Sequence, residues 1–506
     1  MSNPDGSVRL KNSRRNIISG FLNLMVATVL PFINRTIIIH TLGSEFTGLS
    51  DLFSSILEVL NIAEFGFSVV IVYYLYEPLA QNDTDTINRI MTWIRKVYNL
   101  VGGAIFIGGL ITAPFLTRLI HGTYPEEINI YIVFLIYVLN SGLSYFLFAY
   151  KETILVADQR KDILSNINTG IKISVNLLQF AALLIFKNYY LYLIMLVVGT
   201  AVSNLWVNKT VNHRYPYLKI VNHAPKLPKT MRKELVGLMV NRLSNVSRNA
   251  FDSIIISSTL GLVATSIYKN YYMIYTAVVA LTSVFTNSVQ ASIGNSIAVR
   301  TEEENYQNLL DFSLLYSWIA GWCSVTMACL YQPFMKLWVG ESLMLTERDM
   351  LLFVAYFYLI NMNHMRNQYI FGNAFWWKLK WAYLAEAFGN LILNIILGKL
   401  FGITGILIAT ILTIFICNYL MCNDVLFKNY FKHENIWEFY KQQFYYLLAA
   451  AVAIAVTYLL CRNIESIVLR GVICVFLPNV MFFVMYRPCS RWKSSMTYVK
   501  RVLKIR

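Results

Sequence analysis

The chain has 506 residues, of which 57% are hydrophobic and 14% charged, and its mean hydropathy is +0.52. A soluble domain carries about 25% charged residues, so this composition excludes a soluble protein and predicts an integral membrane protein. The net charge of +16 would suit nucleic acid, but its placement along the chain indicates membrane topology instead, and we expect no nucleic-acid partner.

Apolar segments of helical length follow one another along the chain, separated by short polar turns. A membrane-spanning helix needs about 20 mostly apolar residues. The polar start MSNPDGSVRLKNSRRN lacks the features of a cleavable signal, so we expect the first span to be retained. The predicted spans are residues 15–39, 50–75, 94–117, 127–150, 163–186, 189–208, 235–259, 263–297, 309–331, 349–371, 381–399, 403–426, 442–461 and 465–486.

Basic residues concentrate in alternate connections, above all in residues 209–233 and 487–506. Lys and Arg accumulate on the cytoplasmic side of membrane proteins. The bias therefore predicts that both termini are cytoplasmic. The same charges suit anionic lipid headgroups, which makes membrane lipids expected partners.

A short internal repeat divides the chain. RTIIIHTLG, which ends the span 15–39, matches the end of DSIIISSTLG in the span 235–259, and Leu-Gly closes both helices, where glycine suits a left-handed cap. Both spans run in the same direction, which indicates a parallel repeat of two six-helix lobes around a central cavity. The predicted parts are an N-terminal lobe (1–210), a cytoplasmic linker (211–234), a C-terminal lobe (235–426), two further helices (427–486) and a basic cytoplasmic tail (487–506).

Charged residues inside the predicted spans are the candidates for function. Each costs about 2.5 to 3.5 kcal/mol to insert, so each needs a partner, water or a role. The span 235–259 is the most polar. Its residues Arg242, Asn245, Asn249 and Asp252 share one helical face. That face predicts a wet cavity or a lobe interface, although an ion pair between Arg248 and Asp252 that only joins helices is an alternative.

The other charged positions have structural alternatives of the same kind. Arg35 could reach the membrane surface or pair with Glu64, and Lys269 lies among tyrosines that could form an aromatic belt. Arg366, beside His364, could be an interface anchor. The predicted cationic substrate site comprises Arg35, Lys172, Arg242, Arg248 and Lys269, and the predicted polar and ion-coupling set comprises Glu58, Glu64, Asn245, Asn249 and Asp252.

Cationic residues suit an anionic cargo, and arginine suits phosphate because its planar fork donates two hydrogen bonds. No nucleotide-binding, serine-hydrolase or zinc-protease motif occurs. We therefore expect no enzyme activity, no catalytic residue and no cofactor, with transport driven by a coupling cation or the membrane potential. The seven cysteines lie mostly in helices and are interpreted as packing residues, with neither metal binding nor disulfides expected.

Three stretches carry a family resemblance: RTIIIHTLGSEFTGLSDLF, LEVLNIAEFGFSVVIVYYLYEPLAQND and FAYKETILVADQRKD. In this order they resemble the polysaccharide flippases of the multidrug/oligosaccharidyl-lipid/polysaccharide exporter superfamily, over residues 1–165. The resemblance implies two six-helix bundles in a V and an undecaprenyl-diphosphate-linked oligosaccharide as cargo, for O-antigen, capsule or related lipopolysaccharide-type polymers. It further implies a cationic cavity for the diphosphate-sugar head, and a groove beside the last two helices for the polyprenyl tail. The location that it implies is the bacterial cytoplasmic (inner) membrane.

Two other functions are open at this stage. A cation-coupled multidrug exporter of the same superfamily would usually carry an acidic residue in its first helix, where this chain has Arg35. A non-transporting partner of the assembly machinery, which includes a polysaccharide polymerase and a chain-length regulator, would also have short loops.

Overall fold

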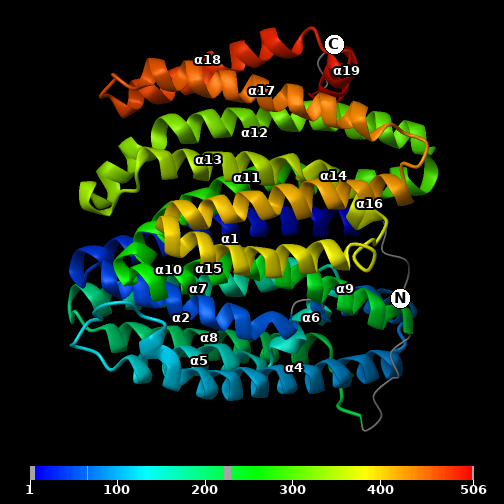
Figure 1. Ribbon diagram of the computed structural model, residues 1–506. Helices are drawn as coiled ribbons and strands as arrows, with labels where there is room; N and C mark the ends of the chain where they lie inside the picture. Colours follow the sequence, from blue (N-terminus) through cyan, green and yellow to red (C-terminus); the bar gives the residue numbers. More distant parts are fainter. Residues whose placement is uncertain (1–5, 65–66, 222–228, 504–506) are drawn as a thin grey trace. The chain divides into compact units, whose positions relative to one another are not determined.

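The structure is a computed structural model, and it describes residues 6–64, 67–221 and 229–503. Helices joined by short turns make up this described part, which contains no strand (Figure 1). The first half holds α1 (Gly6–Thr41), α2 (Ser44–Leu60), η1 (Asn61–Glu64), α3 (Phe67–Gln81), α4 (Thr84–Thr112), η2 (Ala113–Arg118), α5 (Ile130–Phe146), η3 (Ala149–Lys151), α6 (Glu152–Ala157), α7 (Lys161–Leu184), α8 (Tyr189–Arg214), α9 (Lys229–Val246), η4 (Ser247–Phe251) and α10 (Asp252–Leu260). The second half holds α11 (Leu262–Val299), α12 (Glu302–Val339), η5 (Glu341–Leu343), α13 (Glu347–Met362), α14 (His364–Gly372), α15 (Lys380–Thr413), η6 (Ile414–Met421), α16 (Cys422–Asn429), α17 (Ile436–Cys461), α18 (Ile467–Tyr486) and α19 (Trp492–Leu503).

The predicted fold class, an all-α polytopic membrane protein, is confirmed. Each of the predicted spans falls on one helix or on a run of consecutive helices. Nine helices among the described residues are long and apolar enough to cross a membrane, or ten if the bent pair Ile130–Phe146 and Ala149–Ala157 is one span. Two predicted spans merge into the single segment Lys380–Asn429, which bends at Gly402, where φ is 61° and ψ is −138°.

The chain divides into two compact units, Met1–Ser266 and Ile267–Arg506. In this division α9 and α10 cluster with the first unit, whereas the repeat assigned residues 235–259 to the second lobe. The two predicted six-helix lobes therefore remain a prediction. Residues 222–228 of the predicted linker lie outside the described residues.

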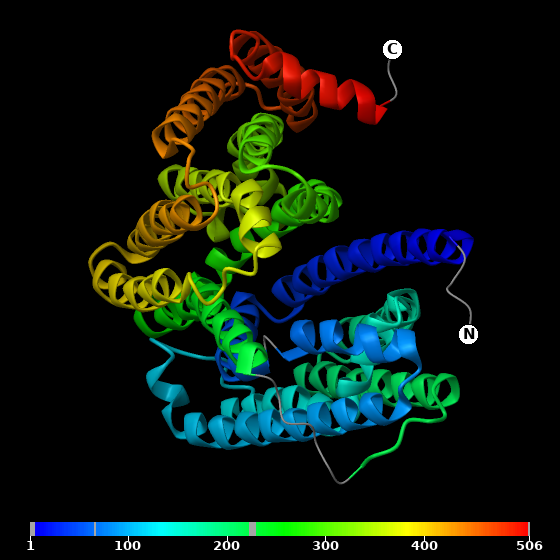
Figure 2. The ribbon, with the colours of Figure 1, turned by 90° about the vertical axis from the view of Figure 1, so that its right-hand side faces the viewer.

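The first unit is held together by apolar faces of α2, α4, α5 and α8. Phe53 of α2 is fully buried and packs edge-on against Phe134 and Tyr137 of α5, at ring-centroid distances of 5.1 and 5.8 Å. Figures 1 and 2 both show α4 and α5 side by side. Aromatic pairs of this geometry add about 0.5 to 1.5 kcal/mol each beyond the area they bury.

Helix α12 forms the centre of the second unit. In its most apolar window 61% of the residues are buried, a larger share than in any other candidate span among the described residues. Helices α17 and α18 lie side by side (Figure 2) and both pack against α12. Two indole groups of α12 reach α18, because Trp318 donates to the Asn479 side chain at 2.7 Å and Trp322 to the Cys474 carbonyl at 2.8 Å.

The two copies of the repeat end in the same backbone geometry. Gly43 and Gly261 both have positive φ, 107° and 89°. Each donates its N–H to the carbonyl of an isoleucine five residues earlier, Ile38 at 3.0 Å and Ile256 at 3.2 Å. Their ψ angles of 166° and −179° are extended rather than left-handed helical, so the predicted glycine requirement holds but the predicted cap type is wrong.

Glycine is also needed where α2 approaches the start of α11. A Cβ atom on Gly48 would lie 2.0 Å from the carbonyl oxygen of Leu262. Only glycine lets the two backbones come this close. The contact places α2 beside the first turn of α11, where Ser266 lies.

Candidate functional site

Arg35 lies in a polar cluster inside the first unit. Its guanidinium donates to both carboxylate oxygens of Asp51, at 3.0 and 2.9 Å, and also to the Ser266 carbonyl at 3.0 Å. The side chains of Arg35 and Asp51 are only 12% and 15% exposed. Thr47 shares a hydrogen bond of 2.6 Å with the Ser266 hydroxyl beside them. The cluster thus joins α1, α2 and the start of α11 through a bidentate ion pair, the strong form of this interaction.

The partner of Arg35 is Asp51, which is not among the site residues predicted from the sequence. The alternatives weighed there were the membrane surface and Glu64, whose side chain lies outside the described residues. Asp51 stands in SDLF, one residue inside the predicted span 50–75. An intramembrane acid sixteen residues after an intramembrane arginine was the signal that could have found it.

A second polar cluster lies where α9 passes into α10. Arg242 donates to Glu58 of α2 at 3.4 Å, and both side chains are about one-third exposed. Arg248 donates to the Asn245 side chain and is buried. Asp252 is also buried, at 0% exposure.

A π-helical turn, η4 (Ser247–Phe251), interrupts the helix between these residues. Such a turn adds one residue to the helical period, so the face predicted from steps of three and four residues is not continuous through it. Asn249 is half-buried, whereas Arg248 and Asp252, on either side of it, are buried. Single π-turns occur frequently at functional sites.

The remaining predicted cations are Lys172 and Lys269. Lys172 is exposed on α7 of the first unit. Lys269 belongs to α11 in the second unit, where its ammonium lies 4.9 Å from the centre of the Tyr272 ring. The structure groups Arg35 with Asp51 and Arg242 with Glu58.

Three of the four tyrosines around Lys269 are interior residues rather than parts of an aromatic belt. Tyr268, Tyr271 and Tyr275 are at most 4% exposed. Tyr275 stacks on Tyr356 of α13 at 4.6 Å, and Tyr271 packs on Tyr331 of α12 at 5.1 Å. Their role in the second unit is to join α11 to α12 and α13.

Arg366 forms a buried network in the second unit. It donates to the carbonyl and side-chain oxygens of Asn418, both at 2.9 Å, and to Asn363 at 2.7 Å. Asn418 in turn donates to Glu386 at 3.2 Å. Arg366 is 1% and Glu386 0% exposed, so this network holds α14, α15 and η6 together rather than anchoring the protein at a membrane surface.

A basic pocket of about 410 Å³ lies in the first unit, where α4 begins and α8 ends. The segment 215–221 forms one wall, because Asn88 accepts from the Lys219 N–H at 2.9 Å and Thr92 accepts from the Val221 N–H at 3.1 Å. Lys151 forms another, donating to Asn208 at 2.6 Å with its ammonium 5.3 Å from the Phe148 ring.

Among the described residues, three cations and no acid line this pocket: Arg95, Lys151 and Lys219. Arg95 has no ion pair within the described part of the chain. An anion with several oxygens would suit the site, because arginine and lysine donors favour phosphate. The sequence analysis missed these residues, since Arg95 and Lys151 stand at the ends of predicted spans and only the fold brings Lys219 to them.

An apolar groove of about 560 Å³ lies in the second unit between α13, α15 with η6, and α17. Its walls are aliphatic and aromatic, with Tyr358, Phe415, Trp437 and Ala451 among them. Helix α17 is the first of the two helices beyond the predicted lobes. The other, α18, contributes nothing to the groove among the described residues, and packs on α12 instead.

Known structures share this architecture. No protein-family model matches the chain, and no curated protein matches it. A lipid II flippase in an inward closed conformation is 14% identical, with a TM-score of 0.68 over 93% of this chain and 98% of its own. A MATE-family multidrug resistance transporter of the MOP superfamily is 12% identical (TM-score 0.59, 82% of this chain and 98% of its own), and a Vibrio cholerae MATE transporter is 13% identical (0.57, 84% and 98%).

This chain has the fold of these transporters. The likeness in fold that the three sequence stretches predicted is therefore confirmed, and the protein is an all-α, multi-pass membrane protein with the fold of these transporters. At 12–14% identity the likeness concerns the fold alone.

Proposed function

We propose that this protein moves undecaprenyl-diphosphate-linked oligosaccharide repeat units across the bacterial cytoplasmic membrane by alternating access, for export of surface polysaccharide. Transport starts at the cytoplasmic leaflet and ends at the outer leaflet. The chain performs no enzymatic step in this scheme.

The apolar groove of the second unit carries the proposal. A polyprenyl chain is long and wholly apolar, and the groove offers it aliphatic and aromatic walls from α13, η6 and α17. A fully polar drug would gain nothing from such a surface. The likeness to a lipid II flippase over 93% of this chain supports the same class of cargo, one whose lipid stays in the membrane.

The diphosphate-sugar head is proposed to bind at a site formed by the cationic set Arg35, Lys172, Arg242, Arg248 and Lys269. Of these, Arg35 already has a carboxylate partner, so it serves the site by positioning α1 rather than by direct contact. Glu58, Glu64, Asn245, Asn249 and Asp252 are the proposed polar and ion-coupling residues. Exchange of the Arg242–Glu58 pair for an Arg242–phosphate contact is a reasonable coupling step, because the pair is long at 3.4 Å and partly exposed.

The basic pocket of the first unit is assigned to the headgroup of an anionic membrane lipid. Its three cations lie where the positive-inside bias predicts the cytoplasmic surface, at which anionic lipids gather. We expect Arg95→Gln with Lys151→Gln to lower the amount of anionic phospholipid that copurifies with the protein, measured by mass spectrometry. Lys96→Gln, an exposed neighbour outside the pocket, is the matched control and should keep it.

Deletion of the gene tests the function. We expect loss of surface polysaccharide and accumulation of lipid-linked repeat units on the cytoplasmic face, identified by mass spectrometry of the polyprenyl-linked glycans. Unpolymerised repeat units on the outer face would instead identify a partner of the polymerase. Unchanged polysaccharide with increased drug sensitivity would identify a multidrug exporter.

Complementation of the deletion strain tests the groove. Ala451 lines it, whereas its neighbour Val452 is 49% exposed and lies outside it. Ala451→Trp fills the groove and should abolish export at normal protein level, while Val452→Trp should restore export. Full export by Ala451→Trp would contradict the assignment of the polyprenyl tail to this groove.

A further inference from the structure

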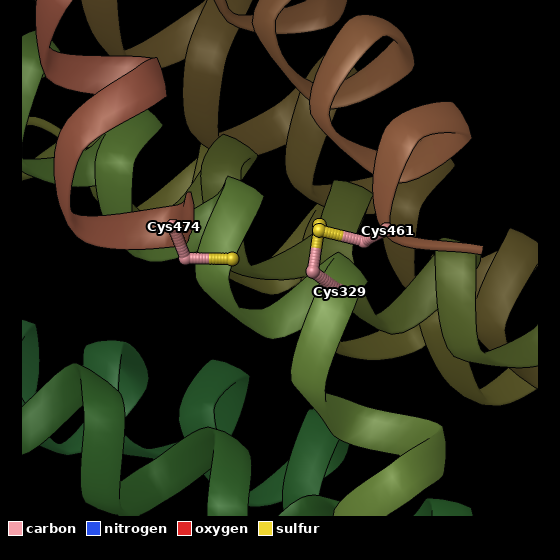
Figure 3. A group of neighbouring side chains, drawn as sticks. All are labelled: Cys329, Cys461 and Cys474. Atoms are coloured by element: carbon pink, nitrogen blue, oxygen red, sulfur yellow. The ribbon is translucent and has the colours of Figure 1, made fainter. Parts of the chain in front are cut away.

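Three cysteines from three helices of the second unit meet at one point. They are Cys329 in α12, Cys461 at the end of α17 and Cys474 in α18. Figure 3 shows their side chains pointing toward one another, and all three Sγ atoms lie within 4.8 Å of one another. Each residue is only 1% exposed. The fold, not the sequence spacing, creates this cluster.

The cluster has the dimensions of a metal site. A metal bound to three thiolates in a plane, at about 2.3 Å from each, holds the sulfurs about 4 Å apart. Because the Sγ atoms already lie within 4.8 Å of one another, each sulfur would move by only a few tenths of an ångström to bind the metal. No histidine or carboxylate joins the group among the described residues, so the donor set is three soft sulfurs.

An arginine beside the cluster supplies compensating charge. Arg470, one helical turn before Cys474, donates to the Cys329 carbonyl at 3.3 Å and to the Ile464 carbonyl at 2.6 Å. It forms no ion pair within the described residues. Arg470 is half-buried and held only by carbonyls among the described residues, and a thiolate–metal complex would place an anion beside this cation.

Side-chain packing alone accounts less well for this arrangement. Cys417 and Cys422 show the packing role, since both are buried and the Cys422 thiol donates to the Cys417 carbonyl at 3.5 Å. Beside the cluster, Thr457 stands one turn before Cys461 on the same face of α17. It is 0% exposed, and its hydroxyl has no hydrogen-bond partner among the described residues.

We propose that Cys329, Cys461 and Cys474 bind one soft, thiophilic metal ion, and that Cu(I) matches the site best. Thiolate ligands select soft metals, whereas a structural zinc site would require a fourth ligand. On binding, the three thiols release three protons and three sulfur–metal bonds form. The complex with Cu(I) carries two negative charges, of which Arg470 offsets one. The metal then joins α12, α17 and α18, independently of the transport function proposed above.

Titration of the purified full-length protein with Cu(I) tests the site. The protein is kept reduced in detergent, and Cu(I) is supplied from a competing chelator of known affinity. We expect about one tightly held copper per chain with sulfur-only coordination by X-ray absorption, the soft-ligand signature. Cys329→Ser, Cys461→Ser and Cys474→Ser should each lose it, whereas Cys417→Ser, a buried cysteine outside the cluster, should keep it.

The stability of the same proteins gives a second measurement. Cu(I) should raise the melting temperature of the wild type and of Cys417→Ser, but not that of the cluster variants. Alanine variants at each position accompany the serine variants, so that a failure of one to fold leaves the position testable. Arg470→Gln should weaken copper binding by about tenfold, the lower end of the effect of outer-shell partners.

Two results would overturn the proposal. One is copper retention by folded cluster variants at the wild-type level. The other is a wild-type protein that binds no Cu(I) after full reduction. A mass lower by two hydrogens before reduction, combined with that failure to bind, would show that two of the cysteines form a disulfide instead.

Discussion

Arg35 shows how a charged side chain is kept inside an apolar helix. Its guanidinium is bound on two sides, by the Asp51 carboxylate and by the Ser266 carbonyl. Because both charges of the ion pair are largely buried, water cannot solvate either charge well if its partner is removed. The pair therefore contributes mainly through the penalty for breaking it.

Replacing one partner of this pair should be more damaging than replacing both. We expect Asp51→Asn or Arg35→Met alone to destabilise the protein by about 3 kcal/mol, because each leaves an uncompensated buried charge or polar group. The double variant with Asp51→Leu should recover part of that loss. Thermal unfolding of the purified variants measures both effects.

An exposed pair in the same unit provides the control. Arg89 and Asp85 on α4 are 51% and 66% exposed and lie 2.7 Å apart. Asp85→Asn should cost no more than about 0.5 kcal/mol, as is usual for exposed i,i+4 pairs. Equal losses at Asp51 and Asp85 would contradict the interpretation of burial.

Arg248 lies at the π-helical turn and is a buried member of the proposed cationic set, at 7% exposure. We expect Arg248→Ala to abolish export while the protein reaches the membrane at its normal level, because the alanine removes a phosphate ligand from the proposed site. Export is measured as surface polysaccharide in the deletion strain. Arg248→Lys, which keeps the charge but not the planar fork, should restore only part of it. Normal export by Arg248→Ala would show that this arginine only joins helices.

At the scale of elements, close helix contacts depend on positions that carry no side chain. We expect Gly48→Ala to destabilise the first unit by about 1 to 3 kcal/mol, because its methyl group would overlap the Leu262 backbone and separate α2 from α11. Thermal unfolding, followed by protein level in the membrane, measures the loss. Gly103→Ala in α4 meets no atom within 4 Å and should be neutral or slightly stabilising, as alanine favours helix by about 1 kcal/mol over glycine.

Helices could be predicted from the sequence better than their contacts. Apolar length alone located every predicted span on a helix, because a membrane leaves a backbone few other ways to satisfy its hydrogen bonds. The interruptions were not predicted. The π-helical turn at Ser247–Phe251 and the bend at Gly402 leave the apolar pattern unchanged, so hydropathy carries no sign of them.

Polar contacts between distant segments were also beyond the sequence. Lys219 and the three clustered cysteines each acquire their neighbours through packing, since nothing in the sequence spacing relates Cys329 to Cys461. The glycine at each repeat end was predictable, because Leu-Gly occurs twice in register. Only the family resemblance suggested a groove beside α17. Neither the residue pattern nor the resemblance suggested the basic pocket.

At the scale of the whole molecule, α17 and α18 are integral to the second unit rather than an appendage. They cover α12, with Gly321 against the Phe482 ring and Trp318 bonded to Asn479. We expect removal of residues 436–506 to expose this face and to lower strongly the amount of folded protein in the membrane. Removal of residues 487–506 alone leaves α17 and α18 in place and should have a smaller effect. Full expression of the longer truncation would contradict this role.

The cluster around Arg35 has a consequence for synthesis in the cell. Asp51 follows Arg35 by 16 residues, but Ser266 follows it by 231. At about 5 to 20 residues per second, the ribosome delivers Asp51 within about 1 to 3 s and Ser266 only about 10 to 50 s after Arg35. The arginine must therefore enter the membrane as part of a two-helix intermediate, and the first unit completes its polar core only when α11 emerges. Chaperones or quality-control proteases that act during translation would meet that intermediate before the final contact forms.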